Sequence, residues 1–415
     1  MKEKRKLYLL TDYYPYGQAE SFVGDEIRQM SRYFDVAVMP RYVLPGEVRP
    51  LPDGVRLLPV RCRKNPLTIL VAVVGFFCNK LGRHEIKAVI SSGEKRVSRL
   101  KKSLSAWVSA QLLWKELKNS GAVDCPEGCI YYSFWYTPSA LALSFHREDL
   151  LGAKVVVRTN GYDLYNDRAS GGRQPFKPAA DKGIDMIISS CRYGQEYYRD
   201  TFGFTPGAKH VLSLLGTETQ EQPATLSDGV FRLVSCSNVN EQKRVERIAQ
   251  ALAVIGADVV VDWVHMGSGA DFSRLKETVE KLLSGKKNIT WKLLGHVHHE
   301  RVLQYYREEP WNCFITTSQS EGGCPVSIQE AMAFGLPVIG TSVGGITEML
   351  TESENILLDV DASPQKIAKA IEQMYRMPLK ERRELCLFNR QRWQERYDGL
   401  KNGQILANAI SSLWE

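Results

Sequence analysis

Residues 313–350 combine loops and a helix start that are well suited to bind a phosphorylated ligand. The stretch reads CFITTSQSEGGCPVSIQEAMAFGLPVIGTSVGGITEML. We expect a strand, a glycine-containing loop with the carboxylate of Glu321, and a helix that opens near Ser327 and stops at Gly335 and Pro337. In open α/β sheets the ligand lies at the carboxyl ends of the strands, where a helix N-terminus offers free N–H groups to phosphate. The pattern therefore predicts a diphosphate site at one sheet edge.

Two adjacent cations, Lys243 and Arg244, stand at the start of another expected helix, after the strand candidate 232–236. Cations at a helix N-terminus oppose the macrodipole, which costs about 0.3–1 kcal/mol each. A bound anion would reverse the sign of that contribution. The pair therefore predicts phosphate binding, and the alternative is a solvated helix start.

The elements that must position these residues are short apolar runs that alternate with helical patterns along all 415 residues. Strand candidates stand at 7–11, 36–40, 55–60, 129–133, 155–159, 186–190, 232–236, 259–265, 289–294, 313–317, 337–341 and 355–359. Several are continuously apolar, which is typical of buried parallel strands. Repeated strand–helix order predicts an α/β protein whose parallel sheets carry helices on both faces. The polar stretch 216–229 interrupts the pattern, so we expect two domains.

The segment 313–350 resembles the signature of the retaining family-4 (group 1) glycosyltransferases, which have the GT-B fold. The family pattern joins a Ser-x-x-Glu-Gly loop, a Glu-Ala-Met-Ala-x-Gly-x-Pro-Val-Ile stretch and a Gly-Gly-x-x-Glu motif. These three motifs stand here at 318–322, 330–339 and 344–348. Weaker likeness covers nearly the whole chain, including 14–17 near the start and 158–163 at the end of a strand candidate.

The resemblance implies two Rossmann-like domains that face a cleft, with a C-terminal helix that returns to the first domain. Residues 1–215, with the returning tail 379–415, would bind the acceptor, and residues 217–378 would bind the donor. The implied enzyme is a hexosyltransferase that moves a sugar from a UDP- or GDP-sugar to a hydroxyl with retention. A sugar or lipid-linked acceptor in bacterial cell-surface polysaccharide or glycolipid synthesis would fit. GT-B enzymes generally need no bound metal, so we expect no cofactor.

The resemblance also implies roles for the donor-side residues. Glu321 would face the reacting carbon of the donor sugar, and Glu330 would bind the ribose hydroxyls, because a carboxylate can accept two hydroxyl hydrogen bonds. Lys243 matches the lysine of the family's diphosphate grip, and Arg244 would replace the arginine whose place Asn238 takes. The remaining donor-side candidates are Val326 and Ser327 for phosphate, Gly322, Gly323 and Cys324 for the sugar, and Val297 for the nucleobase.

Several features depart from the family pattern or have a simpler interpretation. Eight residues separate Glu321 from Glu330, where the family usually has seven. Ser327 and Glu330 also fit a helix capping box. Asn160 stands where many members carry a histidine. It could line the sugar site but could not transfer a proton, so the leaving phosphate would take the acceptor proton, or the protein would be a catalytically weakened nucleotide-sugar-binding protein.

Two positions in the first domain are candidates for the acceptor side, each with a plainer alternative. Gly17 follows the first strand candidate and could instead be an ordinary turn. Asp163 could instead cap a helix. A dinucleotide oxidoreductase is disfavoured because no GxGxxG follows the first strand candidate.

The segment 61–118 is strongly basic, with thirteen Lys or Arg against three Glu, a net charge of +10. It contains a twelve-residue apolar run, 67–78, too short for the roughly 20 residues of a membrane span. The run is either a core helix or an interfacial one. Its flanking cations are Arg61, Arg63, Lys64, Lys80 and Arg83. An anionic membrane surface or a solvated helical face would explain this charge, whereas no motif for nucleic-acid binding is present.

The nine cysteines are scattered, odd in number and mostly inside apolar runs. We therefore expect buried reduced thiols and a cytoplasmic protein, held peripherally at the inner face of the membrane if that surface is its partner. Cys125 and Cys129 have no second pair at zinc-site spacing. The run 296–299, His-Val-His-His, resembles a metal-binding tract, but we expect no metal there.

Overall fold

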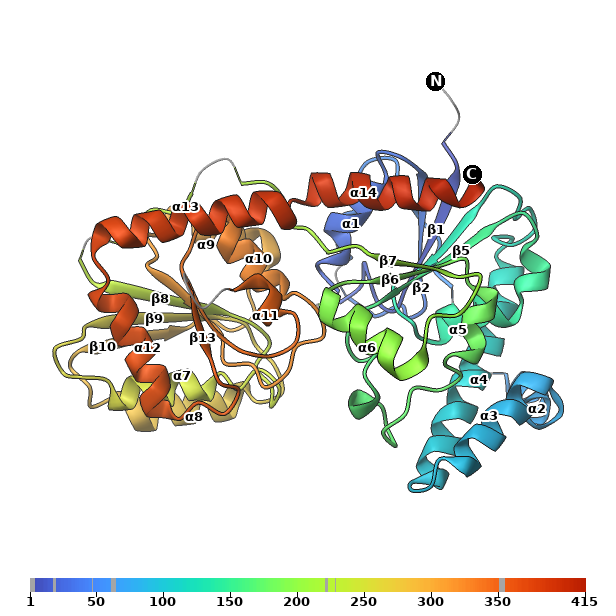
Figure 1. The fold of residues 1–415 in the computed structure, drawn as a ribbon, viewed down its shortest axis with the longest axis horizontal. Coiled ribbons are helices and arrows are strands. Elements are labelled where there is room, and N and C mark those ends of the chain that lie inside the picture. Colours follow the sequence, from blue (N-terminus) through green and yellow to red (C-terminus); the bar gives the residue numbers. More distant parts are fainter. Residues whose placement is uncertain are drawn as a thin grey trace. The chain divides into compact units, whose positions relative to one another are not determined.

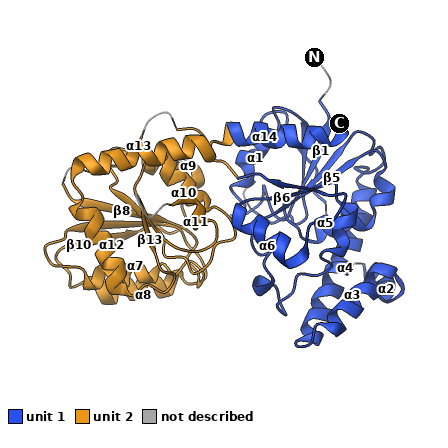
Figure 2. Cartoon of the chain, in the orientation of Figure 1, with its two compact units in different colours: residues 1–214, 401–415 blue, residues 215–400 orange. Residues whose placement is uncertain are grey.

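The computed structural model of the chain describes residues 4–17, 20–46, 48–60, 65–220, 223–227, 229–350 and 355–415. The chain divides into two compact units (Figure 2). Unit 1 comprises Met1–Leu214 and Lys401–Glu415, and unit 2 comprises Leu215–Leu400. Each unit is built around one parallel sheet.

The sheet of unit 1 has seven strands in the order β3-β2-β1-β4-β5-β6-β7, and every pairing is parallel (Figure 1). The strands are β1 Lys6–Thr11, β2 Asp35–Pro40, β3 Arg56–Leu57, β4 Ile130–Ser133, β5 Lys154–Thr159, β6 Met186–Ser189 and β7 Lys209–Leu212. The helices are α1 Val23–Met30, α2 Pro66–Cys78, α3 Lys80–Ser91, α4 Arg96–Asn119, α5 Pro138–Phe145, α6 Arg192–Phe202 and α14 Gly399–Ser411. β4 and β6 are buried along their whole length, as expected of strands in the interior of a parallel sheet.

The sheet of unit 2 has six strands in the order β10-β9-β8-β11-β12-β13, again all parallel. The strands are β8 Phe231–Cys236, β9 Val261–Met266, β10 Ile289–Leu293, β11 Cys313–Ile315, β12 Val338–Thr341 and β13 Ile356–Leu358. The helices are α7 Glu246–Val254, α8 Phe272–Leu283, α9 His299–Glu308, α10 Val326–Ala333, α11 Ile346–Met349, α12 Pro364–Arg376 and α13 Leu379–Arg396.

Both sheets follow the doubly wound order 3-2-1-4-5-6, with a seventh strand added in unit 1. The order reverses between β1 and β4 in unit 1 and between β8 and β11 in unit 2. In such sheets the ligand binds outside the carboxyl ends of the strands at this switch point. The predicted α/β architecture with parallel sheets is confirmed. In unit 2 this topology predicts a ligand site at the loops that follow β8 and β11.

The tail of the chain differs from the prediction that all of 379–415 returns to the first domain. α13 belongs to unit 2, where it packs on α10 and its buried Trp393 donates from Nε1 to Thr217 Oγ1 at 2.8 Å. Only the residues from Lys401 onward belong to unit 1. There α14 lies close to α1, since a Cβ on Gly403 would stand 2.4 Å from Gln29 Cβ. The helical pattern of 379–415 did not indicate that this segment forms two helices, α13 and α14, that pack in different units.

The described part of the chain contains no single helix that is long and apolar enough to cross a membrane. α2 and α3 together reach the length and composition of a span, but they are bent by 67° at the break between them. Eight cysteines lie in the described residues and all are free thiols. Cys78 and Cys125 are exposed, which corrects the expectation that the thiols are buried.

Candidate functional site

An ion pair joins the two loops at the switch point of unit 2. Lys243, in the loop between β8 and α7, donates from Nζ to Glu321 Oε1 at 2.5 Å. Glu321 lies in the loop between β11 and α10, and its side chain is only 8% exposed. Because β8 and β11 are paired and parallel, their loops emerge side by side at one sheet edge. The structure therefore brings together the predicted phosphate ligand and the predicted catalytic carboxylate.

One main-chain and one side-chain hydrogen bond of Gln242 hold these two loops together. Gln319 N donates to Gln242 O at 2.7 Å, and Gln242 Nε2 donates to Ser320 O, also at 2.7 Å. This reciprocal clamp lies next to Lys243 on one loop and next to Glu321 on the other. Gln242 was not predicted from the sequence, because a glutamine in a polar loop does not by itself indicate a contact.

The Gly-Gly motif at 344–345 packs closely against the backbone of the Glu321 loop. A Cβ on Gly344 would stand 2.1 Å from Glu321 O, and a Cβ on Gly345 would stand 2.4 Å from Gly323 C and O. Gly344 also has a φ of +49°. No side chain fits at either position without moving this backbone, so the two glycines fix the position of the Glu321 loop.

The helix that follows this loop, α10, begins at Val326 with Pro325 as its N-cap residue and has no side-chain cap. Ile328 N and Gln329 N both donate to Pro325 O, so within the helix the N–H groups of Val326 and Ser327 have no acceptor. These two groups are the predicted phosphate donors. The capping-box alternative is wrong, because Ser327 lies inside the helix and not at its N-cap.

Glu330 lies one turn further along α10, and its side chain is 6% exposed. His299, the first residue of α9, lies with Nε2 2.6 Å from Glu330 Oε1. Burial raises the pKa of the Cys236 thiol at the end of β8, and the nearby Glu330 charge raises it further. The predicted ribose ligand therefore lies near the end of β8 and the start of α9. His299 was not predicted as the partner of Glu330, since a run of histidines indicates metal binding and does not reveal a contact with a distant carboxylate.

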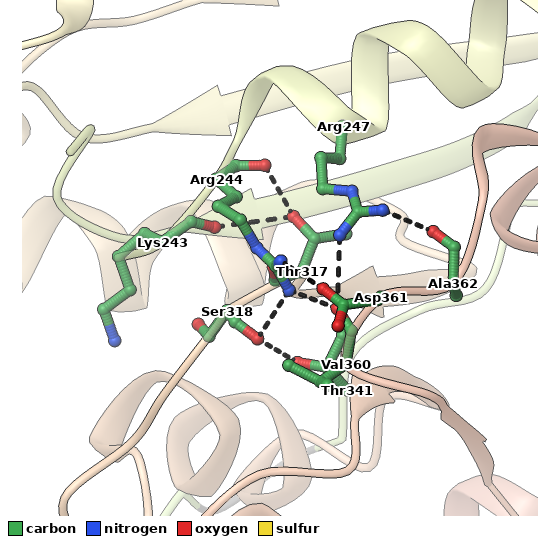
Figure 3. Close-up of polar contacts among 9 residues, drawn as sticks. All are labelled: Lys243, Arg244, Arg247, Thr317, Ser318, Thr341, Val360, Asp361 and Ala362. Atoms are coloured by element: carbon green, nitrogen blue, oxygen red, sulfur yellow. Dashed lines mark hydrogen bonds and ion pairs between the residues drawn. The ribbon is translucent and has the colours of Figure 1, made fainter. Parts of the chain in front are cut away.

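Arg244 adopts a different position from its neighbour (Figure 3). Its Nε donates to Thr317 O at 3.2 Å, its Nη2 donates to Ser318 O at 3.3 Å and to Val360 O, and its Nη1 pairs with Asp361 at 3.3 Å. The side chain of Lys243 points away from this cluster (Figure 3). All three guanidinium nitrogens are thus engaged within the protein. This geometry favours a structural role for Arg244 over the predicted contact with phosphate.

The other donor-side candidates lie in the loops of the same edge. Gly322 and Gly323 are partly exposed between Glu321 and α10. Cys324 is buried, and its Sγ lies 3.7 Å from Gly345 O, so its side chain packs inside the loop. Val297 is partly buried in the connection between β10 and α9. The described residues contain no group of three His, Cys, Asp or Glu that could hold a metal.

In unit 1, Asn160 and Asp163 share one turn at the end of β5. Asn160 Nδ2 donates to Phe134 O at 3.2 Å, and its Oδ1 accepts from Ser190 Oγ at 2.5 Å. Asp163 is buried and accepts from the backbone N–H groups of Asn160, Gly161 and Tyr136, the last at 2.8 Å. Burial raises the pKa of Asp163. Asp163 therefore organises the turn that presents Asn160, and it does not cap a helix.

The loop after β1 completes the switch point of unit 1. Gly17 has a φ of +67°, and a Cβ there would stand 2.9 Å from Leu44 Cδ1, which fits the turn alternative. Two buried carboxylates that were not predicted from the sequence, Asp12 and Glu20, follow β1 in the chain. Asp12 accepts from Tyr162 Oη at 2.9 Å, and Glu20 accepts from the backbone N–H groups of Tyr13 and Tyr14. Burial raises the pKa of Glu20.

Comparison with known proteins decides the class of this site. Residues 217–391 match the family model described as glycosyl transferases group 1. Unit 2 belongs to the group 1 glycosyltransferases. The resemblance inferred from the three motifs is thereby confirmed. The matched residues include the Lys243–Glu321 pair, the Gly-Gly support and Glu330.

Two solved structures share the fold of the whole chain. Sucrose-phosphate synthase from Thermosynechococcus elongatus has a TM-score of 0.73 and 16% identity, over 99% of each chain. Anabaena HepE, in complex with UDP and glucose, has a TM-score of 0.69 and 13% identity, over 98% of this chain and 100% of that one. At these identities the likeness shows the fold, and the chain has the GT-B fold that was predicted for a group 1 glycosyltransferase.

A curated relative, N-acetyl-alpha-D-glucosaminyl L-malate synthase from Bacillus anthracis, is 29% identical over 129 residues. Those residues are 31% of this chain and 32% of the relative. In the curated relatives that match, the matched part spans between 32% and 62% of the relative's own length. The group 1 match therefore identifies the unit that carries the site.

Proposed function

We propose that the protein is a retaining glycosyltransferase that moves a hexosyl unit from a UDP- or GDP-sugar to a hydroxyl group of an acceptor. The observation that carries this proposal is the pairing of Lys243 with Glu321 at the switch point of a group 1 glycosyltransferase unit. A cation and a carboxylate there suit the two halves of such a donor, its diphosphate and its sugar. HepE, whose structure contains UDP and glucose, supports UDP as the first donor nucleotide to test.

In this proposal the donor diphosphate takes Lys243 away from Glu321. The ammonium group and the N–H groups of Val326 and Ser327 would then hold the phosphates, because a helix N-terminus favours an anion. Glu321 would be released to face the donor sugar. Glu330, positioned by His299, would accept hydrogen bonds from the ribose hydroxyls.

The transfer itself exchanges one bond at the anomeric carbon for another on the same face. The bond from this carbon to the leaving phosphate oxygen breaks, and a bond to the acceptor oxygen forms. The leaving phosphate takes the proton of the acceptor hydroxyl, so no protein base is required. Asn160 suits this scheme, since an amide can hold a sugar hydroxyl but cannot accept its proton at neutral pH.

We further propose a sugar or lipid-linked sugar as the acceptor and a peripheral position at the cytoplasmic face of the membrane, in cell-surface polysaccharide or glycolipid synthesis. The basic character of 61–118 supports this, because anionic lipids attract such segments. Of the cations flanking the apolar run, Arg61, Arg63 and Lys64 lie outside the described residues.

The decisive experiment is turnover with a panel of UDP- and GDP-sugars. Released nucleoside diphosphate is measured on prolonged incubation, with and without simple sugar acceptors, and NMR assigns the anomeric configuration of any product. We expect slow donor hydrolysis with one sugar and product of retained configuration. Binding without any turnover would instead favour the catalytically weakened nucleotide-sugar-binding protein. A product of inverted configuration would contradict the retaining mechanism.

A further inference from the structure

Helix α2 exposes an apolar face along its whole length. Its five members, here called the α2 face, are between 50% and 69% exposed, and they are Leu67, Leu70, Val71, Val74 and Phe77. Their spacing of three or four residues and its multiples places them on one side of a helix. The opposite side is well packed: Phe76 is fully buried, and Trp107 Nε1 of α4 donates to Ala72 O at 2.9 Å. The exposure therefore belongs to an ordered helix with one unpartnered side.

Cations border the α2 face at both ends. Lys115 of α4 donates from Nζ to Thr68 Oγ1 at 3.0 Å, which places this ammonium beside the first turn of α2. Lys80 and Arg83 are exposed directly after the last turn. Within the described residues 65–118, ten Lys or Arg stand against three Glu. One of these three, Glu85, is buried and paired with Arg173, so it does not offset the surface charge.

The dimensions of α2 suit a helix that lies in a membrane surface. Its 13 residues span roughly 20 Å, against a hydrocarbon core of about 30 Å. The 67° bend at Asn79 turns α3 away from the axis of α2. Asn79 also caps α3 by accepting from Leu81 N at 2.8 Å, so the bend is a built junction between two helices. α2 by itself is therefore too short to cross a bilayer and has the dimensions to lie flat on its surface.

We propose that the α2 face is a monotopic membrane contact, and that its partner is the surface of an anionic lipid bilayer. The five apolar side chains enter the boundary between headgroups and acyl chains, about 5–10 Å deep for helices of this kind. Lys80, Arg83 and Lys115 extend to the lipid phosphates while their stems stay against the helix. Charge complementarity favours this partner over an apolar protein groove. The inference rests on the lipid-linked acceptor of the proposed function, which it would place within reach of unit 1.

The test compares matched variants in vesicle co-sedimentation. The full chain is mixed with phosphatidylcholine vesicles that contain or lack phosphatidylglycerol, at low and high salt. L70S/V74S removes two members of the α2 face without touching the packed side. L151S is the control, because Leu151 is 75% exposed in unit 1 outside this helix. K80E/R83E tests the charge.

We expect binding to anionic vesicles that falls with salt, a loss of about tenfold or more for L70S/V74S, and no change for L151S. K80E/R83E should weaken partitioning by roughly fivefold or more for each cation removed. Equal binding of L70S/V74S and L151S would overturn the proposal. Binding to neutral vesicles that is as strong as binding to anionic ones would also overturn it. A protein that does not bind vesicles but forms a dimer, which the L70S/V74S substitutions dissociate, would overturn it as well.

Donor hydrolysis, measured on the same preparations without vesicles, separates this inference from the proposed function. It should be unchanged in L70S/V74S, since the α2 face belongs to unit 1 and the donor site to unit 2. Turnover without vesicle binding overturns the membrane contact alone. Salt-dependent vesicle binding without turnover supports the membrane contact and contradicts the transferase.

Discussion

Replacing Lys243 by methionine tests the ion pair at the switch point most directly. Methionine keeps much of the length of the side chain and removes its charge. Lys243 Nζ lies 2.5 Å from Glu321 Oε1, and the Glu321 side chain is 8% exposed. Two effects should follow, because the same ammonium group pairs with Glu321 without donor and, in the proposed function, would bind the diphosphate with donor.

The first effect is a loss of UDP affinity. A hydrogen bond to a charged group contributes about 1.5–3 kcal/mol. Its loss corresponds to an increase in Kd of roughly 10- to 150-fold. The second effect is a loss of stability, because Glu321 would be left buried without its cation, at a cost of about 1–3 kcal/mol. For a unit of this size that lowers Tm by about 2–12 °C.

The double variant K243M/E321Q separates these two effects. Glutamine removes the uncompensated charge, so Tm should recover most of the loss while UDP affinity stays low. Lys292→Met is the matched control, since Lys292 is an exposed lysine of β10 in the same unit and should change neither quantity. Calorimetric titration gives Kd, and a thermal scan without nucleotide gives Tm. If K243M binds UDP like the unmodified protein and only its Tm falls, the lysine is structural and the phosphate assignment is refuted.

Four further outcomes follow from the site and its surroundings. Glu330→Gln should weaken UDP binding by about tenfold but leave the binding of 2′,3′-dideoxy-UDP unchanged, and equal losses for both nucleotides would exclude ribose as its ligand. EDTA should leave UDP titrations unchanged, because the described residues offer no metal cluster, and a loss of binding would contradict the metal-free site. Gly345→Ala should lower both Tm and UDP affinity, since its Cβ would meet the backbone of Gly323 at 2.4 Å. Unaltered UDP affinity would show that the position of the Glu321 loop is not critical for binding. Lys177 is buried in unit 1, where its Nζ donates to Asp163 O at 2.5 Å. Burial lowers its pKa to about 8, below the ordinary 10.5, so the unfolded chain binds the proton more tightly. The free energy of unfolding should therefore rise between pH 8 and 10.5 by up to about 3 kcal/mol relative to the Lys177→Met variant, and urea titrations that give both proteins the same dependence on pH would contradict this.

The strand pattern of the chain could be predicted because parallel buried strands are continuously apolar. β4, β5 and β6 were found at almost their observed bounds. β7 was missed, since Lys209–Leu212 is short, partly exposed and lies at the sheet edge, where the apolar signal is weak. The strand order could not be predicted from the residues alone, because nothing in a strand's own sequence names its neighbours.

Site residues that stand in a recognisable motif could be predicted from the sequence. Residues that reach the site only through contacts formed on folding could not. Glu321, Glu330 and Lys243 stand in the motifs and lie at the edge that those motifs imply. His299 and Gln242 stand outside these motifs, and each reaches the site through contacts with residues far away in the sequence. The role of Glu330 was ambiguous in sequence because a capping box needs the same residue types, and only the start of α10 at Val326 resolved it.

Lys243 and Arg244 are adjacent in sequence, but their side chains lie in different surroundings. This difference explains why the prediction that Arg244 also contacts the phosphate is not favoured. Arg244 has a φ of +46° and precedes α7, which begins only at Glu246. The two side chains therefore do not follow one helix face, and they point in different directions (Figure 3). The diphosphate would then meet one side-chain cation, Lys243, and the roughly +0.5 charge of the α10 N-terminus. Without donor, Glu321 already neutralises that cation. A nucleotide sugar must therefore compete with Glu321 for Lys243, and in doing so it would release the carboxylate toward its own sugar.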